Sequence, residues 1–216
     1  MSAAHGHPHR HPPQPDLEDG PYSWHMALTD ALAQLLIAKG VFDREALRAT
    51  LERIDAATPA QGARLVARAW VDPAFRERLL ADVNAAAREL GIDPGPIPIR
   101  AVADTPDVHN VIVCTLCSCY PRFLLGAPPD WYKSRAYRAR VVREPRAVLA
   151  EFGLELPPEV RVVVHDSTAE LRYMVLPLRP LGTANWSEEQ LARLVTRDCM
   201  IGTAVPRLPD PACLDA

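Results

Sequence analysis

The 216-residue chain has no long apolar run: no stretch approaches the roughly 18 residues that a membrane-spanning helix needs. It has no basic excess either, because 24 Lys and Arg stand against 27 Asp and Glu and leave a net charge of −3. This balance, with no basic helix face, argues against nucleic acid and membranes as partners. The N-terminus has histidines and prolines where a secretory signal needs an apolar segment, so we expect a cytoplasmic protein that binds small molecules or other proteins.

Cysteine is also scarce, with five residues in all, and the number is odd. In a reducing compartment such a set does not form a disulfide framework, which favours metal or redox chemistry. Cys199 and Cys213 stand alone, and we expect a buried core thiol and a free thiol in a proline-rich tail, respectively. The other three crowd into residues 114–119, which read CTLCSC.

Composition divides the chain into parts of different character. Residues 1–21 are rich in histidine and proline and offer almost nothing to a core, so we expect a disordered tail. Residues 22–91 combine helical apolar spacing with capping residues and glycine stops, which predicts a helical arm. After a proline-rich break, residues 92–216 alternate β-branched runs with helical patterns, which predicts a mixed α/β layered domain. The predicted fold class is α+β.

The second half contains the clearest signals for individual elements. We predict strands over residues 109–113, 160–165 and 171–177, and helices over 144–153 and 186–197. In the arm, the apolar side chains form too broad a surface for short helices to bury among themselves, so we expect part of the arm to contact another subunit. These side chains are Leu65, Val66, Trp70, Phe75, Leu79 and Leu80.

Several interpretations compete for the clustered cysteines. A zinc site needs four ligands, and no second cysteine or histidine pair stands at a useful spacing. A thioredoxin-like pair needs a helix to begin at Cys117, which Tyr120 and Pro121 disfavour. Buried structural thiols would pack poorly among small polar residues. A compact metal claw explains the spacing, because three sulfurs from one short loop can occupy one face of an octahedral ion.

In such a claw, Cys114, Cys117 and Cys119 supply the sulfur ligands. Two further positions fall to the backbone, where the nearest donors are the deprotonated amide nitrogens of Ser118 and Cys119. The sixth position stays open for water or substrate. The spacing therefore predicts a metal centre with one free site.

The segment CTLCSC and the sequence that follows, LGAPPDWYKSRAYRARVVREPRAVLAEFG, resemble the metal-binding subunit of the nitrile hydratase and thiocyanate hydrolase family. The resemblance runs from about His109 to Pro206 and is weaker over the arm. It implies a hetero-oligomeric enzyme, a hydro-lyase or hydrolase, in which Cys114 is the axial thiolate. It also implies that Cys117 and Cys119 are oxidised to sulfinate and sulfenate during maturation.

Thr115 stands where the resembled family has threonine in cobalt members and serine in iron members. The resemblance therefore implies low-spin Co(III), with Fe(III) as the weaker alternative. Sulfur anions and amidates around a trivalent ion leave a charge of roughly −2, which cannot be buried without compensation. In the resembled family, arginines of a partner, the beta-like subunit, contact the oxidised sulfurs and supply that compensation.

Position 122 bears on the substrate. Typical nitrile hydratases have tryptophan there, whereas thiocyanate hydrolase metal subunits share the Tyr-Pro-Arg sequence of this chain. Arg122 can hold an anion such as thiocyanate by charge-assisted hydrogen bonds, and the alternative is a structural salt bridge or neutralisation of the claw. The implied reaction is hydration of a carbon–nitrogen triple bond, which yields carbonyl sulfide and ammonia from thiocyanate or an amide from an organic nitrile.

Other residues receive roles around the claw. A bound metal would act as a Lewis acid on the nitrile end of the substrate. Water, or the sulfenate oxygen of Cys119, would attack the substrate carbon. The Ser118 hydroxyl would hold the sulfenate or the incoming water. Two acidic residues, Asp166 and Glu170, match family carboxylates behind the metal and are candidates to orient partner arginines. The alternative is that the segment DSTAE forms an Asx-type turn with an acid on the surface and has no role at the metal. Most aromatic and basic residues that follow the claw, including Arg138, are expected to form interface and scaffold.

A non-catalytic alternative is a cobalt or nickel trafficking module, in which the histidine-rich tail collects the metal and the claw holds it. Amide ligation makes metal exchange slow, which is the opposite of what a carrier needs. Sulfinate at Cys117 would count against trafficking, and labile reduced thiols would count for it.

Overall fold

The computed structural model describes residues 22–209. The predictions of a disordered tail over residues 1–21 and of a free thiol at Cys213 lie outside the described residues. None of the described helices is long and apolar enough to cross a membrane. The elements follow in the order α1 (Trp24–Ala38), α2 (Arg44–Asp55), α3 (Pro59–Val71), α4 (Pro73–Ala81), α5 (Val83–Glu89), β1 (Ile99–Ala103), β2 (Val108–Val113), α6 (Arg122–Leu125), α7 (Asp130–Lys133), α8 (Arg135–Arg140), α9 (Pro145–Glu151), β3 (Arg161–Asp166), β4 (Arg172–Leu176), α10 (Glu188–Ala192) and α11 (Arg197–Ile201).

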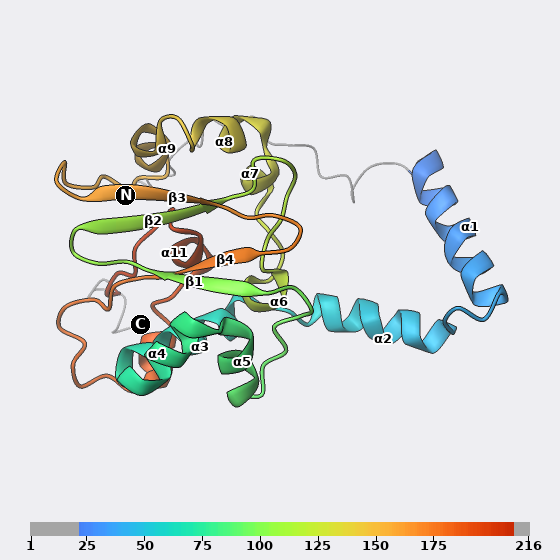
Figure 1. Ribbon diagram of the computed structural model, residues 1–216, viewed down its shortest axis with the longest axis horizontal. Coiled ribbons are helices and arrows are strands. Elements are labelled where there is room, and N and C mark those ends of the chain that lie inside the picture. Colours follow the sequence, from blue (N-terminus) through green and yellow to red (C-terminus); the bar gives the residue numbers. More distant parts are fainter. Residues whose placement is uncertain (1–21, 210–216) are drawn as a thin grey trace, which may run out of the picture.

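Two pairs of strands form the centre of the molecule (Figure 1). β1 pairs with β4, and β2 pairs with β3, each in parallel register. The second register joins Val113 to Asp166, so β2 and β3 end side by side. Because the clustered cysteines begin directly after Val113, this register brings them to the common end of both strands.

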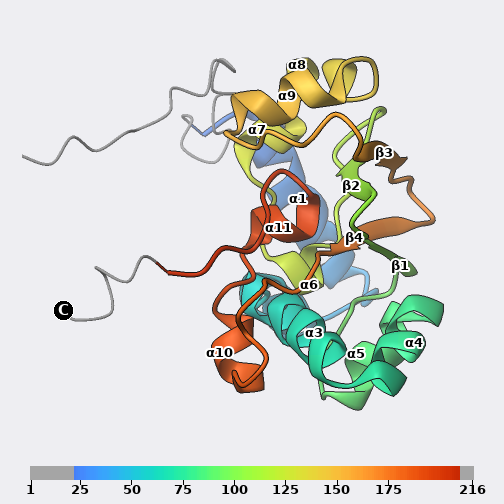
Figure 2. The same cartoon turned by 90° about the vertical axis from the view of Figure 1, so that its left-hand side faces the viewer.

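Helices lie on both sides of the strands, as Figures 1 and 2 show. The segment α7–α9 lies beyond β3, the segment α3–α5 lies beyond β1, and α11 lies in the middle, in contact with β2 and β4. Helices and strands therefore share one body, and the predicted α+β class is confirmed.

Most predicted elements of the second half are present. The predicted strands correspond to β2, β3 and β4, and the predicted helix over 144–153 corresponds to α9. β1 has no predicted counterpart, because its short sequence IRAVA follows a proline-rich break. The helix predicted over 186–197 is wrong in extent: Ser187 and Gln190 form the expected capping box of the short α10, but Thr196 then caps α11 by accepting from a backbone N–H.

This chain itself covers the six apolar side chains from which we expected a subunit contact of residues 22–91; the contact of these residues with a partner stays a prediction. Four of the six apolar residues assigned to it, with Leu65 and Leu79 at 0% exposure, are buried, and the other two are partly buried against the same core. The reason is that α3–α5 pack on β1, α6, α10 and α11 of this chain. Whether residues 22–91 form a separate unit stays a prediction.

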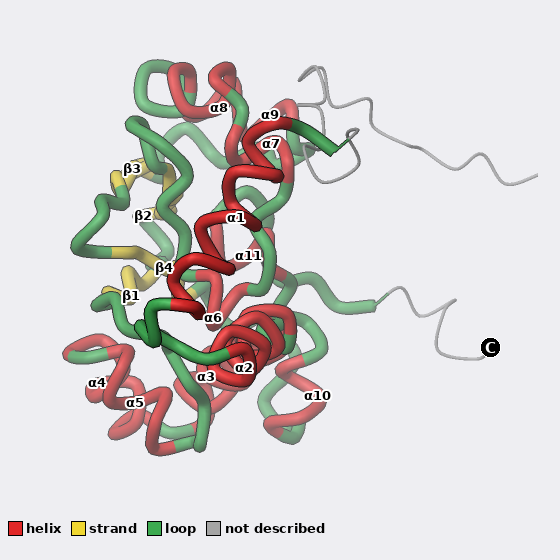
Figure 3. The backbone as a smooth tube through the Cα atoms, turned by 90° about the vertical axis from the view of Figure 1, so that its right-hand side faces the viewer, coloured by secondary structure: helices red, strands yellow, loops and turns green. Residues whose placement is uncertain are grey.

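The exposed apolar residues lie on α1 instead. Leu28, Leu32 and Leu35 are 51%, 52% and 51% exposed, and neither α1 nor α2 contains a buried residue. These two helices extend away from the strands in Figure 1, and α1 stands in front of the body in the side view of Figure 3. They form the arm proper, and the name "arm" is used below for α1 and α2 alone.

A buried polar cluster fixes β2 in its surroundings. The backbone N–H of Asn110 donates to the Asp104 carboxylate at 2.8 Å, and Nε2 of His109 lies 2.7 Å from the carbonyl oxygen of Gly202. Nε2 of His165, on β3, lies 2.8 Å from the side-chain oxygen of Asn110. Since buried polar groups are stable only when hydrogen-bonded, this cluster holds the strand that carries the cysteines.

Candidate metal centre

The clustered cysteines form one compact group at the end of β2, in residues 114–119, which we call the claw loop. The Sγ atom of Cys117 lies 3.4 Å from that of Cys114 and 3.2 Å from that of Cys119. All three sulfurs lie within 4.8 Å of one another, and no other such group of metal-binding side chains occurs within residues 22–209. Cys114 and Cys119 are buried while Cys117 is exposed, so the group is anchored in the core and open on one side.

The claw loop gives its thiols different acidities. Hydrogen bonds from the thiols of Cys119 and Cys114 lower the pKa of Cys117, and the backbone N–H groups of Ser118 and Cys119 add to this effect. Burial, with help from the neighbouring thiols, raises the pKa of Cys119 to about 12. Cys117 is therefore the first of this pair to become a thiolate, which is the form that binds metals.

Asp166 fastens the start of the claw loop to the end of β3. One carboxylate oxygen accepts the backbone N–H of Thr115 at 2.9 Å, and the other accepts the Thr115 hydroxyl at 2.6 Å. Glu170 is exposed and is not brought to the loop. The turn between β3 and β4 is held by Thr168, whose hydroxyl accepts from the backbone N–H groups of Glu170 and Leu171.

The segment α7–α8 supports the claw loop from the other side. The Tyr132 hydroxyl donates to the carbonyl oxygen of Cys119 at 3.0 Å, and the Arg138 guanidinium donates to that of Cys117 at 3.0 Å. Tyr137, which precedes Arg138 in the chain, is fully buried, and its hydroxyl donates to the carbonyl oxygen of Ile112, on β2, at 2.7 Å. The loop is thus held through its backbone carbonyl groups, while its sulfurs contact one another.

Ser118 and Arg122 lie at the exposed side of this region. Ser118 is exposed at the tip of the loop, and so is Leu116, two residues earlier in the chain, which is 86% exposed. Arg122 is the first residue of α6 and is also exposed. A cavity of about 160 Å³ begins one residue past the loop, at Tyr120, and is lined by both Arg122 and Arg172, with several prolines and Phe123 around them. No residue of the claw loop is among those that line it.

Sequence reasoning missed Arg172. This residue opens β4, and its charge opposes the rise in the pKa of Cys119. Its Nη1 atom is buried and has no hydrogen-bond partner among the described residues. The signal that could have revealed it is a basic residue at the start of a strand that is otherwise apolar, two positions after Glu170.

The donor set fits a transition metal better than zinc in a closed site. Three thiols converge, and no histidine or carboxylate of residues 22–209 joins them to complete a four-ligand set of side chains. Soft sulfur ligands select transition metals. The backbone N–H groups of Ser118 and Cys119 help to lower the pKa of the Cys117 thiol. The amide nitrogens named as candidate ligands therefore lie next to the sulfur group.

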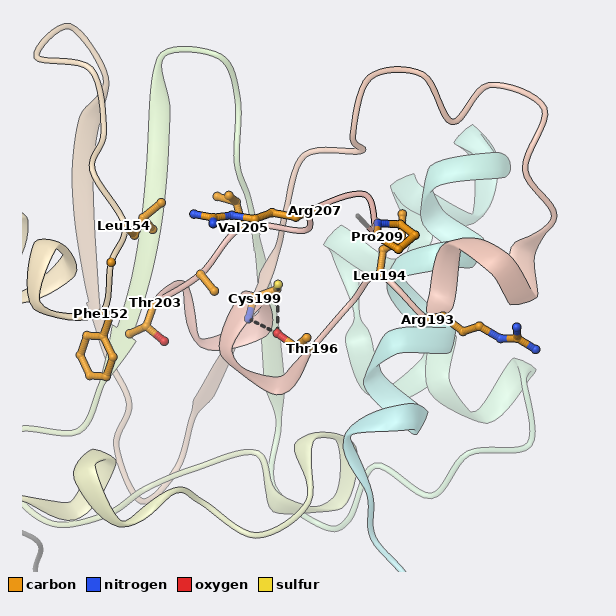
Figure 4. Close-up of a pocket in the computed structure, with 12 residues that line it drawn as sticks. Phe152, Leu154, Arg193, Leu194, Thr196, Cys199, Thr203, Val205, Arg207 and Pro209 are labelled. Carbon is orange, nitrogen blue, oxygen red and sulfur yellow. Dashed lines mark hydrogen bonds between the residues drawn. The ribbon is translucent and has the colours of Figure 1, made fainter. Parts of the chain in front are cut away.

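Cys199 lies apart from the claw loop and is a core thiol, as expected. It is 1% exposed, and its Sγ atom lies 3.1 Å from the Thr196 hydroxyl. Burial raises the pKa of its thiol. It is among the residues that line a cavity of about 490 Å³. Figure 4 shows it beside Thr196, below the segment that carries Val205 and Arg207 in that view. Nothing in this cavity belongs to the sulfur group.

Comparison with known proteins identifies relatives along almost the whole described chain. Residues 24–204 match the family model described as "Nitrile hydratase, alpha chain". The low-molecular weight cobalt-containing nitrile hydratase subunit alpha of Rhodococcus rhodochrous is 50% identical over 188 residues, which cover 86% of this chain and 91% of that protein. Thiocyanate hydrolase subunit gamma of Thiobacillus thioparus is 46% identical over 189 residues, covering 82% of this chain and 78% of that protein.

A solved structure gives the same result. Recombinant thiocyanate hydrolase comprising partially modified cobalt centres superposes with a TM-score of 0.80 at 45% identity, over 86% of this chain and 91% of that one. The matched family range begins at the start of α1, so the likeness includes the arm and reaches further toward the N-terminus than the motifs around the cysteines.

Proposed function

Because the chain belongs to the nitrile hydratase alpha-chain family, we propose that it is the metal-binding subunit of a hetero-oligomeric, cobalt-dependent enzyme that hydrates a carbon–nitrogen triple bond. The relatives named above are enzyme subunits, and their names refer to cobalt or to thiocyanate hydrolysis. The observation that carries the proposal is the claw loop, whose three sulfurs lie within 4.8 Å of one another. A cytoplasmic location is part of the same proposal.

The chain's own atoms account for the metal ligands in this proposal. Cys114, Cys117 and Cys119 bind through sulfur, and the amide nitrogens of Ser118 and Cys119 complete the set. Thr115 in the claw loop and the cobalt-containing relatives favour Co(III) over Fe(III). When bound, the metal supplies a Lewis acid that polarises the triple bond of the substrate.

For the substrate, we propose thiocyanate. Two guanidinium groups, of Arg122 and Arg172, line the cavity of about 160 Å³ that begins just past the claw loop, and such a pair suits a small linear anion. No ion pair joins Arg122 to another described residue, which supports a free anion clamp over a structural salt bridge. The balanced reaction consumes thiocyanate and two waters and yields carbonyl sulfide, ammonia and hydroxide.

Side chains of the claw loop have the remaining roles. The exposed Ser118 hydroxyl holds the attacking water, and the oxygen of Cys119, once this residue is oxidised to sulfenate, orients or replaces that water as the nucleophile. Asp166 acts through Thr115, since its two hydrogen bonds keep the loop at the end of β3. Glu170, which is exposed in the turn between β3 and β4, is the remaining candidate for orienting arginines of the partner.

The proposed partner is a nitrile hydratase beta-like subunit. A loaded claw carries net negative charge, and arginines of the partner that contact the oxidised sulfurs would compensate it. Leu116, at the tip of the claw loop, is 86% exposed, and Leu28, Leu32 and Leu35 on α1 are half exposed. Apolar side chains left in water at both places are suited to contact with another subunit.

The test is a comparison of substrates in the assembled enzyme. The chain is co-expressed with its partner subunits in cobalt-supplemented cells, and thiocyanate is compared with a small aliphatic nitrile by following carbonyl sulfide and amide. Wild type should prefer thiocyanate, and R122W should lose on the order of tenfold or more in kcat/KM for thiocyanate alone, because one charge-assisted contact is removed. R135Q, on the exposed start of α8, is the matched control.

Preference of the wild type for the nitrile would overturn the role of Arg122 and make the chain a nitrile hydratase alpha subunit. That second candidate is favoured by the 50% identity to a nitrile hydratase alpha subunit. Mass spectrometry of the claw-loop peptide distinguishes these two enzyme functions from metal trafficking. An enzyme subunit should carry sulfinate at Cys117, and a metal carrier should carry reduced thiols.

A further inference from the structure

One peptide of the claw loop is held by a cation of the same chain. The carbonyl oxygen of Cys117 accepts a hydrogen bond from Nη1 of Arg138 at 3.0 Å. This carbonyl belongs to the same planar peptide as the amide nitrogen of Ser118, one of the candidate ligands. Because the C=O and N–H of a trans peptide point in opposite directions, fixing the carbonyl also fixes the direction of the nitrogen.

The nitrogen side of this peptide lies in the loop that carries the sulfur group. The backbone N–H of Cys117 donates to Sγ of Cys114 at 3.3 Å, and the backbone N–H groups of Ser118 and Cys119 help to lower the pKa of the Cys117 thiol. Arg138 therefore holds the carbonyl side of a peptide whose amide side lies next to the sulfurs. A displaced carbonyl would turn the amide nitrogen of Ser118 out of this position.

Arg138 is itself held in place and carries an unneutralised charge. It follows Tyr137, which is fully buried and anchors α8 to the end of β2. Its Nε atom is buried and has no hydrogen-bond partner among the described residues. Two residues along the same helix, Arg140 pairs with both Glu144 and Glu151, whereas no carboxylate of residues 22–209 pairs with Arg138.

We propose that Arg138 is a positioning residue of the metal centre, which directs the Ser118 amide toward the sulfurs and offsets part of the negative charge of the loaded claw loop. This inference rests on the proposed function, because it concerns a bound metal. The charge that an amide ligand carries is shared with its carbonyl oxygen by peptide resonance, and a hydrogen bond from a guanidinium to a charged acceptor is about twice as strong as a neutral one. Arg138 would thus slow the loss of metal even before any partner subunit binds.

The experiment follows cobalt release from the full-length chain. Reduced, metal-free protein is loaded anaerobically with cobalt(II), and its sulfur-to-cobalt charge-transfer absorption is followed after addition of EDTA. R138M removes both donor and charge, R138Q keeps donors without charge, and R138K keeps the charge. R135M, on the exposed start of the same helix, is the control. Circular dichroism of each metal-free variant reports on the fold.

We expect R138M to release cobalt on the order of tenfold faster than wild type and to shift the absorption band, because a hydrogen bond to a charged group is lost. R138Q should lie between R138M and R138K, and R135M should match wild type. Release from R138M at the wild-type rate would overturn the inference. If R138M alters the metal-free fold, R138Q and R138K decide: faster release from R138Q supports the role of the charge, and equal rates overturn it.

Failure of the proposed function looks different in the same experiment. A wild-type chain that neither binds cobalt nor shows the absorption band contradicts the proposed metal centre as a whole. A wild-type chain that retains cobalt while R138M retains it equally well contradicts only the role of Arg138.

Discussion

The arm and the body of this chain use similar apolar patterns with opposite results. Leu65 and Leu79 on α3 and α4 are 0% exposed, whereas Leu32 and Leu35 on α1 are 52% and 51% exposed. Leu32 and Leu35 are three residues apart on α1, and Leu79 follows the buried Phe75 by four on α4. The difference is that strands and helices of the same chain cover α3–α5, whereas within residues 22–209 no side chain of α1 is buried. Apolar spacing thus identifies a face that will be buried and leaves open which molecule buries it.

The claw loop belongs to the self-sufficient region. Its backbone is held by Asp166, Tyr132 and Arg138, all from the body of the chain. The sulfur group therefore has a scaffold before any partner is present. The arm and the exposed Leu116, by contrast, present apolar surface whose burial requires another molecule. The comparison predicts that changes in the body reduce stability more than matched changes in or beside the arm.

The largest effect is expected for G202A. Gly202 has φ +91°, and an added Cβ would lie 2.0 Å from the carbonyl oxygen of Asn110, on β2. Backbone cannot yield there, so the free energy of unfolding should fall by on the order of 4 kcal/mol or more. Between the two helices of the arm, Gly40 has φ +69° with open space around it, so G40A should cost only roughly 1–2 kcal/mol of backbone strain. Urea unfolding of the two variants gives the comparison, and equal losses would contradict it.

Core truncation should give the next largest difference. L65A should lower the free energy of unfolding by roughly 2–5 kcal/mol, because a fully buried leucine leaves a cavity. L32A, at a half-exposed position of α1, should change it by less than about 0.5 kcal/mol in the isolated chain. Urea unfolding monitored by circular dichroism measures both. A large loss for L32A would mean that α1 packs on the body in solution.

A smaller effect is expected from removing one hydroxyl beneath the claw loop. Y132F deletes the donor to the carbonyl oxygen of Cys119 and should cost about 1–2 kcal/mol, because a buried acceptor loses its partner. Y22F deletes the exposed hydrogen bond from the Tyr22 hydroxyl to Asp30, on α1, and should lower the free energy of unfolding by less than about 0.5 kcal/mol. Thermal unfolding of both variants measures the two losses of stability. A Y132F protein that is as stable as wild type would contradict the expectation that Y132F loses more than Y22F.

The smallest effect concerns pH. Burial lowers the pKa of His165 below its usual 6.5, so the unfolded chain takes up a proton before the folded chain does as the pH falls. The contribution of His165 to stability is therefore complete above pH 6.5 and declines below it until the folded state is also protonated. H165Q should flatten the dependence of the unfolding midpoint on pH between 5 and 8. H25Q, at an exposed position on α1, should leave the dependence unchanged.

Much of the candidate site was predictable because it is local. The claw loop spans residues 114–119, so the convergence of its sulfurs follows from their spacing in the chain. The capping box of Ser187 and Gln190 is likewise a short-range interaction. The length of α10 was not predictable in the same way, because Thr196 competes for the same stretch by starting α11.

At this site, the sequence determines which groups are close together in the chain, and the tertiary structure decides which distant residues contact them. By itself the sequence determined the donors, the thiols and the adjacent amides, since covalent order keeps them together. Only the tertiary structure decided that Asp166, 51 residues away, fastens Thr115, and that Arg172 lies by Cys119. It also decided that α3–α5 are covered by this chain while α1 is not. Long-range hydrogen bonds and burial depend on which surfaces meet, and an apolar or charged residue does not specify its counterpart.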